Sequence, residues 1–288
     1  MHWTTTRFLI DLSQPKVMGI VNATPDSFSD GGQNFTLSAA LRHCEQLIQD
    51  GADILDIGGE STRPGAQALS YAEELARVLP LVREAVKLGV PVSVDTYKPR
   101  VMQAVLDLGA DIINDVWALR WTSPELSDKS LSGLSVVASY PNCGVCLMHM
   151  HLEPSSMQTS PMTGDVVQQV HSFLQLQSTA LLELGLDRTQ IMLDPGIGFG
   201  KTVAQNMALL ARQHELLTIG FPLLAGWSRK SSLGVVAGTP SVSLTPQERL
   251  VPSVVAAVLA VERGASVVRV HDVLETVQAL KVLSALKY

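Results

Sequence analysis

Eight short runs rich in Val, Ile and Leu alternate with longer segments of helical periodicity along the chain. Within each run the apolar character is nearly continuous rather than alternating, which is typical of parallel strands that are covered on both faces. The runs are KVMGIVN (16–22), DILDIG (53–58), VPVSVDT (90–96), DIINDV (111–116), VCLMHM (145–150), IMLDPG (191–196), FPLLAG (221–226) and SVVRVH (266–271).

The segments between these runs carry apolar residues three and four positions apart, as helices do. One segment ends at Gly51 and another at Gly89, and glycine often follows the last residue of a helix. A strand followed by a helix, eight times over, predicts an α/β fold of the (β/α)8 TIM-barrel type, with eight parallel strands and surrounding helices. No linker is visible, so we expect a single domain over 1–288. The connection 117–144 is the least regular and could hold a helix and a surface excursion.

The composition argues against a nucleic-acid-binding, membrane or disulfide-rich protein. The chain has 288 residues, 46% of them hydrophobic, a net charge of −6 and scattered Lys and Arg residues, so no basic stripe for a nucleic acid is expected. No apolar stretch has the length of a signal peptide or a membrane span. Three cysteines are too few for a disulfide framework. We therefore expect a cytoplasmic protein that binds neither membrane nor nucleic acid.

Polar residues follow nearly every apolar run, at the strand ends where TIM barrels carry their active sites. Helix capping explains any one of them, but eight consecutive junctions make capping alone a poor account. Asp56 lies inside its run with no obvious partner. The strand-end residues are Asn22, Glu60 to Arg63, Asp95, Asn114, His149, Asp194, Lys230, Arg269 and His271.

Three loops strengthen this prediction. ATPDSFSDGG (23–32) and GGESTRPGA (58–66) are long and polar, as loops that close over a ligand are. In DPGIGFGK (194–201), the glycines allow the backbone to approach a flat ligand closely.

Three other motifs give weaker signals. The segment 195–202 lacks the first glycine of a nucleotide-binding phosphate loop. Cys143 and Cys146 have redox-motif spacing but precede a strand, so buried thiols are expected. His149 and His151 are spaced like metal ligands without a completing cluster, and His149 is expected to line the pocket floor or support a neighbour.

Eight motifs in order give the chain a resemblance to the bacterial dihydropteroate synthase family over nearly its whole length. They are MGIVNATPDSFSDGG (18–32), DIGGESTRPGA (56–66), SVDTYKP (93–99), INDV (113–116), CLMHM (146–150), LDPGIGFGK (193–201), SRKS (228–231) and RVHDV (269–273). The chain departs from the family at Tyr97, Trp117 and Trp227, and its connection after the fourth strand is longer.

The resemblance implies an enzyme that condenses 6-hydroxymethyl-7,8-dihydropterin diphosphate with p-aminobenzoate and releases pyrophosphate. It implies that a carboxylate meets the hydrogen-bonding edge of the pterin with two parallel bonds. The pterin residues that it implies are Asp95, Asn114, Val116, Met148, Asp194, Gly198, Phe199 and Lys230.

For the other ligands, the resemblance implies a diphosphate site with Mg2+ bound at Asn22. The diphosphate residues are Asn22, Thr62, Arg63, Arg269 and His271, and the p-aminobenzoate residues are Phe28, Pro64, Phe199, Lys230 and Ser231. The expected catalytic residues are Asp30, Arg63, Lys230, Arg269 and His271. Sulfonamides should compete with p-aminobenzoate, and the family and the apolar segment 250–264 suggest a homodimer.

Two other functions compete with this one. A pterin-binding methyltransferase barrel shares the pterin floor but has no diphosphate to neutralise, which leaves Arg63, Arg269 and His271 without a purpose. A non-catalytic pterin-binding relative should have lost part of the constellation, and none of the expected residues is missing.

Overall fold

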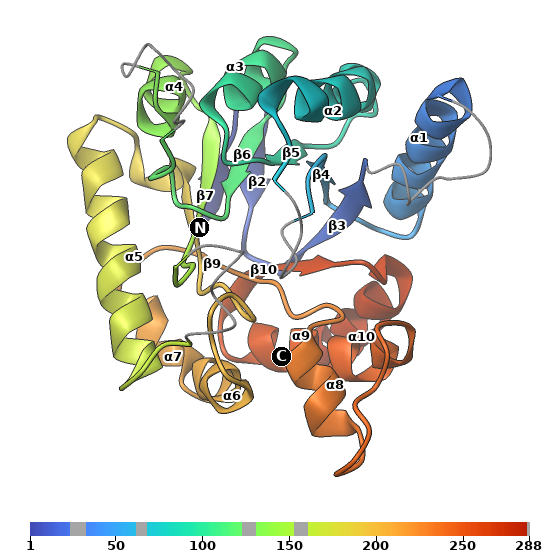
Figure 1. Cartoon of the computed structure of the whole chain (residues 1–288), viewed down its shortest axis with the longest axis vertical. Helices are drawn as coiled ribbons and strands as arrows, with labels where there is room; N and C mark the ends of the chain where they lie inside the picture. Colours follow the sequence, from blue (N-terminus) through green and yellow to red (C-terminus); the bar gives the residue numbers. More distant parts are fainter. Residues whose placement is uncertain (24–32, 62–67, 123–130, 153–160, 287–288) are drawn as a thin grey trace.

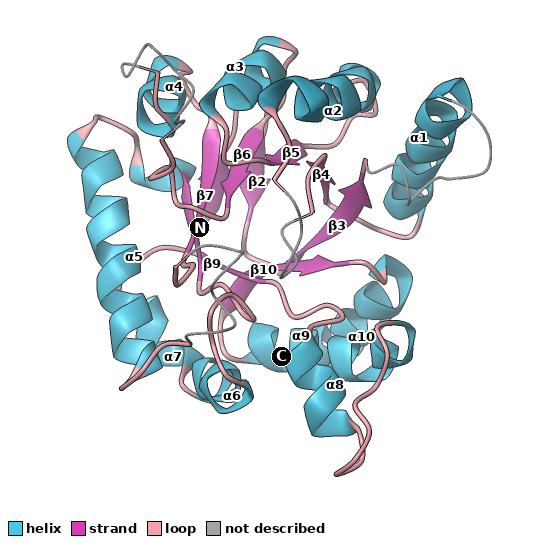
Figure 2. Cartoon of the chain, viewed as in Figure 1, coloured by secondary structure: helices cyan, strands magenta, loops and turns pink. Residues whose placement is uncertain are grey.

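The computed structural model describes residues 1–23, 33–61, 68–122, 131–152 and 161–286. Eight parallel strands close into a barrel in the order β10-β3-β4-β5-β6-β7-β8-β9, and helices surround it (Figures 1 and 2). The strands are β3 (Lys16–Asn22), β4 (Ile54–Gly58), β5 (Val92–Asp95), β6 (Ile112–Asp115), β7 (Gly144–Met148), β8 (Ile191–Asp194), β9 (Leu223–Ala225) and β10 (Ala265–Val270). The predicted TIM barrel is confirmed.

Each predicted run overlaps one barrel strand, but β5 and β9 each begin two residues after the start of their runs. β5 begins after Pro91 and β9 after Pro222, because proline has no N–H to donate to a neighbouring strand. The carbonyls of both prolines still accept hydrogen bonds from the adjacent strand, at 3.1 and 3.0 Å. The ladder of these strands therefore starts one residue after the proline.

The helices fill the segments that had helical periodicity. They are α1 (Gln33–Gln49), α2 (Tyr71–Ala85), α3 (Pro99–Asp107), α4 (Gly133–Ser139), α5 (Val166–Glu183), α6 (Val203–Ala211), α7 (Gln213–Leu217), α8 (Ser231–Ala237), α9 (Leu250–Glu262) and α10 (Val273–Ser284). Gly51 and Gly89 have the positive φ of residues that follow a helix. α2 itself ends at Ala85, and the chain reaches Gly89 through tighter turns.

The irregular connection after β6 begins with a tightly held turn. Ala118 and Leu119 both have positive φ, a conformation that is unfavourable for residues with a side chain. The buried carboxylate of Asp115 holds this turn by accepting hydrogen bonds from the N–H groups of Trp117 and Leu119, each at 2.7 Å. The connection also contains α4, so the predicted helix is confirmed, while residues 123–130 lie outside the described part.

An N-terminal hairpin, which the sequence analysis did not predict, covers the lower end of the barrel. It consists of β1 (His2–Thr4) and β2 (Leu9–Asp11). Trp3 is fully buried and donates to the carbonyl of Gln190 at 2.9 Å, while Arg7 forms an ion pair with Asp111 at 2.6 Å. The hairpin thus closes the end of the barrel opposite the strand C-termini.

The barrel interior is organised in layers because alternate residues of a strand face the same side. The lowest layer is apolar and packs on the hairpin; it consists of Met18, Ile54, Ile112, Cys146, Met192, Leu224 and Val267. Two residues further along these strands lie Ile20, Asp56, Asn114, Met148, Asp194, Gly226 and Arg269. The polar residues of the interior therefore sit directly above an apolar plug.

Within the part of the chain that the structure describes, no helix is both long enough and apolar enough to cross a membrane.

Candidate active site

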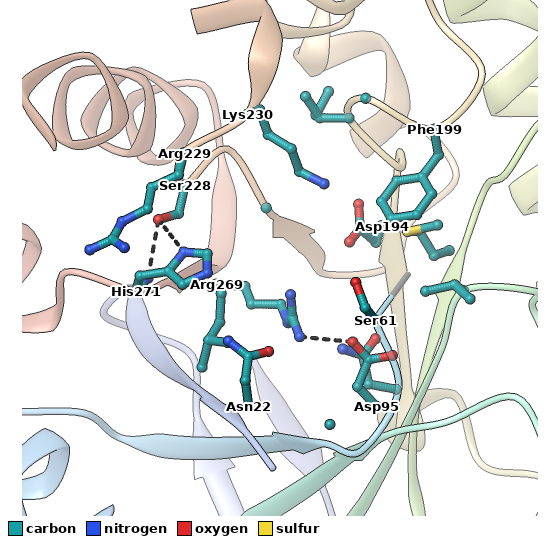
Figure 3. A pocket seen from close by; sticks show the side chains of 18 of the residues that line it. Asn22, Ser61, Asp95, Asp194, Phe199, Ser228, Arg229, Lys230, Arg269 and His271 are labelled. Carbon is teal, nitrogen blue, oxygen red and sulfur yellow. Dashed lines mark hydrogen bonds and ion pairs between the residues drawn. The ribbon is translucent and has the colours of Figure 1, made fainter. Parts of the chain in front are cut away.

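A cavity of about 420 Å³ opens at the C-terminal ends of the strands, above the apolar plug (Figure 3). Every described residue with an expected pterin, diphosphate, p-aminobenzoate, metal or catalytic role lines it. These residues are Asn22, Asp95, Asn114, Val116, Met148, Asp194, Gly198, Phe199, Lys230, Ser231, Arg269 and His271. The remaining predicted site residues, Phe28, Asp30, Thr62, Arg63 and Pro64, lie outside the described residues.

The floor of the cavity is a buried charge network around Arg269. Its guanidinium donates to Asp56 at 2.5 Å and to Asp95 at 2.8 Å, and the Asn114 amide also donates to Asp56, at 3.2 Å. The expectation that Asp56 has no partner is wrong. Asp56 faces the barrel interior, two residues above Ile54 in the plug, and the nearly continuous apolar run around it did not indicate this orientation.

Burial and charge oppose one another in this network. Burial raises the pKa of Asp95 to about 7, although Arg269 acts to lower it. Burial also raises the pKa of Asp194, against a hydrogen bond from Gly196 and the charge of Lys230. For Arg269, burial acts to lower the pKa, but Asp56 and Asp95 outweigh it and raise the pKa above its usual value. A ligand that donates hydrogen bonds to these buried carboxylates would therefore stabilise their ionised form.

Asp194 is oriented by the glycine-rich loop that follows β8. Its Oδ1 accepts a hydrogen bond from the Gly196 N–H at 2.7 Å. Gly196 has φ of +68°, and a Cβ atom there would lie 1.9 Å from the carbonyl oxygen of His149. Only glycine allows the loop to run this close to the end of β7.

The opposite side of the cavity is cationic and comes from β9, β10 and the segments after them. Ser228 Oγ lies 2.9 Å from His271 Nδ1 and accepts from the His271 N–H at 3.1 Å (Figure 3). Lys230 extends towards Phe199, with its Nζ 4.3 Å from the ring centroid. Arg229 and Arg249 add two further cations to the lining.

No role was expected from the sequence for Ser228, Arg229 or Arg249, which also line the cavity. Arg229 has φ of +57°, and its N–H donates to Ser253 at 2.8 Å. Its guanidinium pairs with Asp272 at 2.5 Å. The SRKS motif could have suggested Ser228 and Arg229, whereas Arg249 lies on a short 3-10 turn that has no sequence pattern of its own.

A buried cluster supports the base of the loop after β4. Lys98, whose side chain is 5% exposed, forms ion pairs with Glu60 and with Glu74, the latter at 2.6 Å. Tyr97, one of the departures from the family, donates its hydroxyl proton to Glu60 at 2.8 Å. Its ring also lies 5.2 Å from Trp121. The unusual tyrosine thus packs below the rim and holds Glu60 in place.

The weaker motifs do not form sites of their own. Among the described residues, no group of three or more His, Cys, Asp or Glu side chains could hold a metal ion. Cys143 and Cys146 are buried free thiols, as expected. Lys201 is turned inward onto backbone carbonyls rather than towards an anion, and His149 supports Lys201 rather than lining the cavity floor.

The cavity is divided by charge. Asp95, Asp194 and Phe199 lie on one side, whereas Arg229 and His271 lie on the other, with Arg269 between them (Figure 3). Lys230 points from the cationic segment towards Phe199. Such a cavity fits a ligand with an aromatic hydrogen-bonding part and an anionic part.

The sequence matches a known family and its members. A family model described as "pterin binding enzyme" matches residues 18–271. A dihydropteroate synthase of Neisseria meningitidis serogroup B is 47% identical over 289 residues, covering 99% of this chain and 97% of the relative.

Two solved structures extend the match to the fold. The Xanthomonas albilineans dihydropteroate synthase with 4-aminobenzoic acid has a TM-score of 0.86 and 46% identity, covering 97% of this chain and 95% of that one. The Yersinia pestis dihydropteroate synthase with a sulfonamide drug complex has a TM-score of 0.88 and 42% identity, covering 100% and 99%.

Replacing Asp95 by Asn should change how stability depends on pH. The folded pKa of Asp95 is about 7, above the ordinary 3.8, so between these values the folded state keeps a proton that the unfolded state loses. Wild-type stability therefore falls as the pH rises from about 4 to 7, and Asp95→Asn lacks this loss. Urea unfolding should show the variant gaining on the order of 3 kcal/mol relative to wild type across that window.

The exposed Asp107 provides a matched control, since Asp107→Asn should follow the wild-type pH dependence. Parallel pH profiles for wild type and Asp95→Asn would contradict the assignment.

Proposed function

The chain belongs to the dihydropteroate synthase family of pterin-binding enzymes, and from that premise we propose which residues bind each part of its substrates. It is a transferase that condenses 6-hydroxymethyl-7,8-dihydropterin diphosphate with p-aminobenzoate to give 7,8-dihydropteroate and pyrophosphate. Its substrates are small molecules. The observation that carries the residue roles is the division of the cavity into a carboxylate side and a cationic side.

The carboxylate side binds the pterin in this proposal. The Gly196 N–H orients the Asp194 carboxylate through Oδ1, and in this proposal the two carboxylate oxygens accept two parallel hydrogen bonds from the amine and ring N–H of the pterin. Asn114 and Asp95 bond to other ring nitrogens, and Lys230 donates to the ring oxygen. The apolar residues Val116, Met148, Gly198 and Phe199 flank the ring.

The diphosphate binds on the cationic side. His271 is held by Ser228, and Arg269 lies between the two halves of the cavity. We propose that Arg269 keeps its Nε bond to Asp56 while its terminal nitrogens turn to the diphosphate. The family adds Thr62 and Arg63 to this set, both outside the described residues.

A magnesium ion fits this side only together with its substrate. Mg2+ keeps several waters and binds through one or two protein groups plus substrate phosphates. Asn22, at the end of β3, has an amide oxygen that could act as one such ligand. We propose Asn22 as its protein contact. Bound there, the ion would neutralise charge on the departing diphosphate.

The chemistry is a substitution at the methylene group that joins the pterin to the diphosphate. The bond from carbon to the diphosphate oxygen breaks, a carbon–nitrogen bond forms, and the amine loses a proton. An aromatic amine is a modest nucleophile and pyrophosphate a good leaving group, so the electron-rich pterin can delocalise charge as pyrophosphate departs. Arg269 and His271 stabilise the leaving group, and Lys230 holds the ring. We assign the exclusion of water to the loops with Asp30 and Pro64, which lie outside the described residues.

p-Aminobenzoate binds against Phe199 in this proposal, with its carboxylate near Lys230 and Ser231. Ser231 is the first residue of α8 and is exposed at the cavity mouth. Because α8 has only seven residues, the Ser231 hydroxyl and the Lys230 ammonium carry this assignment rather than the helix end. Phe28 and Pro64 complete the site by family resemblance, and sulfonamides, which one relative binds, should compete here.

The remaining proposals concern the whole chain. Barrel strands extend from Lys16 to Val270 and the hairpin packs beneath them, which supports one domain over 1–288. Buried free thiols at Cys44, Cys143 and Cys146 support a cytoplasmic location. The methyltransferase alternative is disfavoured because it leaves the cationic side of the cavity without a ligand.

We also propose a homodimer that forms through α8, α9 and α10, which lie side by side in Figure 1. Their exposed apolar residues include Val236 (58%), Val251 (69%) and Val282 (68%). Light scattering should give wild type twice the 30.9 kDa chain mass, and Val251→Asp with Val255→Asp should give one chain mass. Leu176→Asp on α5 should stay dimeric, and a double variant that also stays dimeric would contradict this interface.

Asp194→Asn should weaken binding of 6-hydroxymethylpterin by about 100-fold or more. The variant loses the negative charge that accepts two hydrogen bonds, and its amide NH2 group would face an N–H group of the pterin. Titration calorimetry measures this directly. Asp107→Asn serves as the control and should bind like wild type. If Asp194→Asn bound the pterin within threefold of wild type, the pterin would not lie against Asp194.

A further inference from the structure

A buried lysine lies behind the pterin wall, outside the cavity lining. Lys201 is 4% exposed, and its Nζ lies 2.9 Å from His149 Nδ1, 2.8 Å from the Gly196 carbonyl and 3.1 Å from the Phe199 carbonyl. The His149 carbonyl is a fourth acceptor at 3.3 Å. All of these acceptors are neutral. Burying a cation without a bonded carboxylate is unfavourable, so a contribution to the stability of the fold does not by itself explain why a lysine stands here.

We propose that Lys201 is a positioning residue for the pterin, acting on Asp194 through Gly196 and on the ring wall through Phe199. This inference rests on the proposed role of Asp194 in pterin binding. It adds a residue that does not touch the substrate.

The first route runs through a single glycine. Lys201 binds the Gly196 carbonyl, and the Gly196 N–H donates to Asp194 Oδ1 at 2.7 Å. The N–H of His149 also donates to the Asp194 carbonyl, at 3.0 Å. Both the backbone and the side chain of Asp194 are therefore fixed by groups that contact Lys201.

The second route fixes the aromatic wall. Lys201 binds the Phe199 carbonyl, and the Phe199 N–H closes a turn onto the Gly196 carbonyl at 3.2 Å. Between them, the Gly198 N–H donates to Asn206 at 2.8 Å. One ammonium thus holds both ends of the turn from which Phe199 projects towards Asp194 (Figure 3).

The charge of Lys201 acts on the same carboxylate. It helps to lower the pKa of Asp194 against burial, together with Lys230 and Arg269. Burial lowers the pKa of Lys201 itself to about 7, although Asp194 acts to raise it. Burial and the neighbouring Lys201 lower the pKa of His149 to about 2, so its ring is neutral and accepts at Nδ1. Lys201 thus favours the ionised Asp194 that the pterin edge requires.

Lys201→Met tests the inference because it keeps the length of the side chain and removes the ammonium. The dissociation constants of 6-hydroxymethylpterin and of pyrophosphate are measured separately by calorimetry, beside the melting temperature. The pterin constant should rise at least about tenfold, the effect of one lost hydrogen-bond contribution, while the pyrophosphate constant stays within about twofold. Unchanged pterin binding, or equal weakening of both ligands, would overturn the proposal.

Two variants of His149 keep the test decisive if Lys201→Met does not fold. In His149→Asn the amide oxygen can stand close to the position of Nδ1 and accept from Lys201, whereas His149→Phe keeps a ring and removes the acceptor. Pterin binding should stay near wild type in the first and weaken in the second. The reverse order, or no difference, would overturn the proposal.

Asp194→Asn separates this inference from the proposed function. If Asp194→Asn binds the pterin normally, the assignment of the pterin to Asp194 fails. If Asp194→Asn weakens binding and Lys201→Met does not, only the role of Lys201 fails. Lys87→Met, which removes an exposed lysine paired with Glu84, serves as the control and should bind both ligands like wild type.

Discussion

The balance of buried charge inside the barrel is the constraint on which the site depends. Asp56, Asp95 and Asp194 lie above an apolar plug that offers them no compensation, and Arg269 pairs with the first two. Burying a charge is unfavourable unless it is paired and hydrogen-bonded, and burial raises the pKa of Asp95 and Asp194 despite the nearby cations. Asp56 Oδ1 also has no hydrogen-bond partner among the described residues. A ligand that brings several N–H donors would complete the pairing, which supports the proposal that the pterin binds on this floor.

The strand geometry explains why this charge gathers in one place. Inward positions recur every second residue, so on β4, β6, β8 and β10 a step of two residues leads from the apolar plug to a polar residue of the floor. The left-handed turn at Arg229 and the glycines after Asp194 then bring cations to one side and an aromatic wall to the other. The cavity therefore has separate cationic and aromatic sides, to which we assign the diphosphate and the pterin ring of the same substrate.

Much of this could be predicted from the sequence. Nearly continuous apolar runs gave the barrel, and the residues at their ends gave the cavity, because both follow from the strand order alone. Asp56 was missed because an apolar run does not show which of its residues face inward. Arg249 and the N-terminal hairpin were missed because a short 3-10 turn and three-residue strands carry too few residues for a periodic signal. The roles of Arg63 and Asp30 rest on family resemblance, since both lie outside the described residues.

The most direct test of the account is pyrophosphate release from the pterin diphosphate with Mg2+, with and without p-aminobenzoate, by wild type and by Arg269→Met. Wild type should release pyrophosphate only with p-aminobenzoate, and Arg269→Met should release it at least about 100-fold more slowly, because the leaving group and the floor both lose their cation. Arg263→Met, at the end of α9, should release pyrophosphate like wild type. Release by Arg269→Met within a few fold of wild type would contradict the central place given to Arg269.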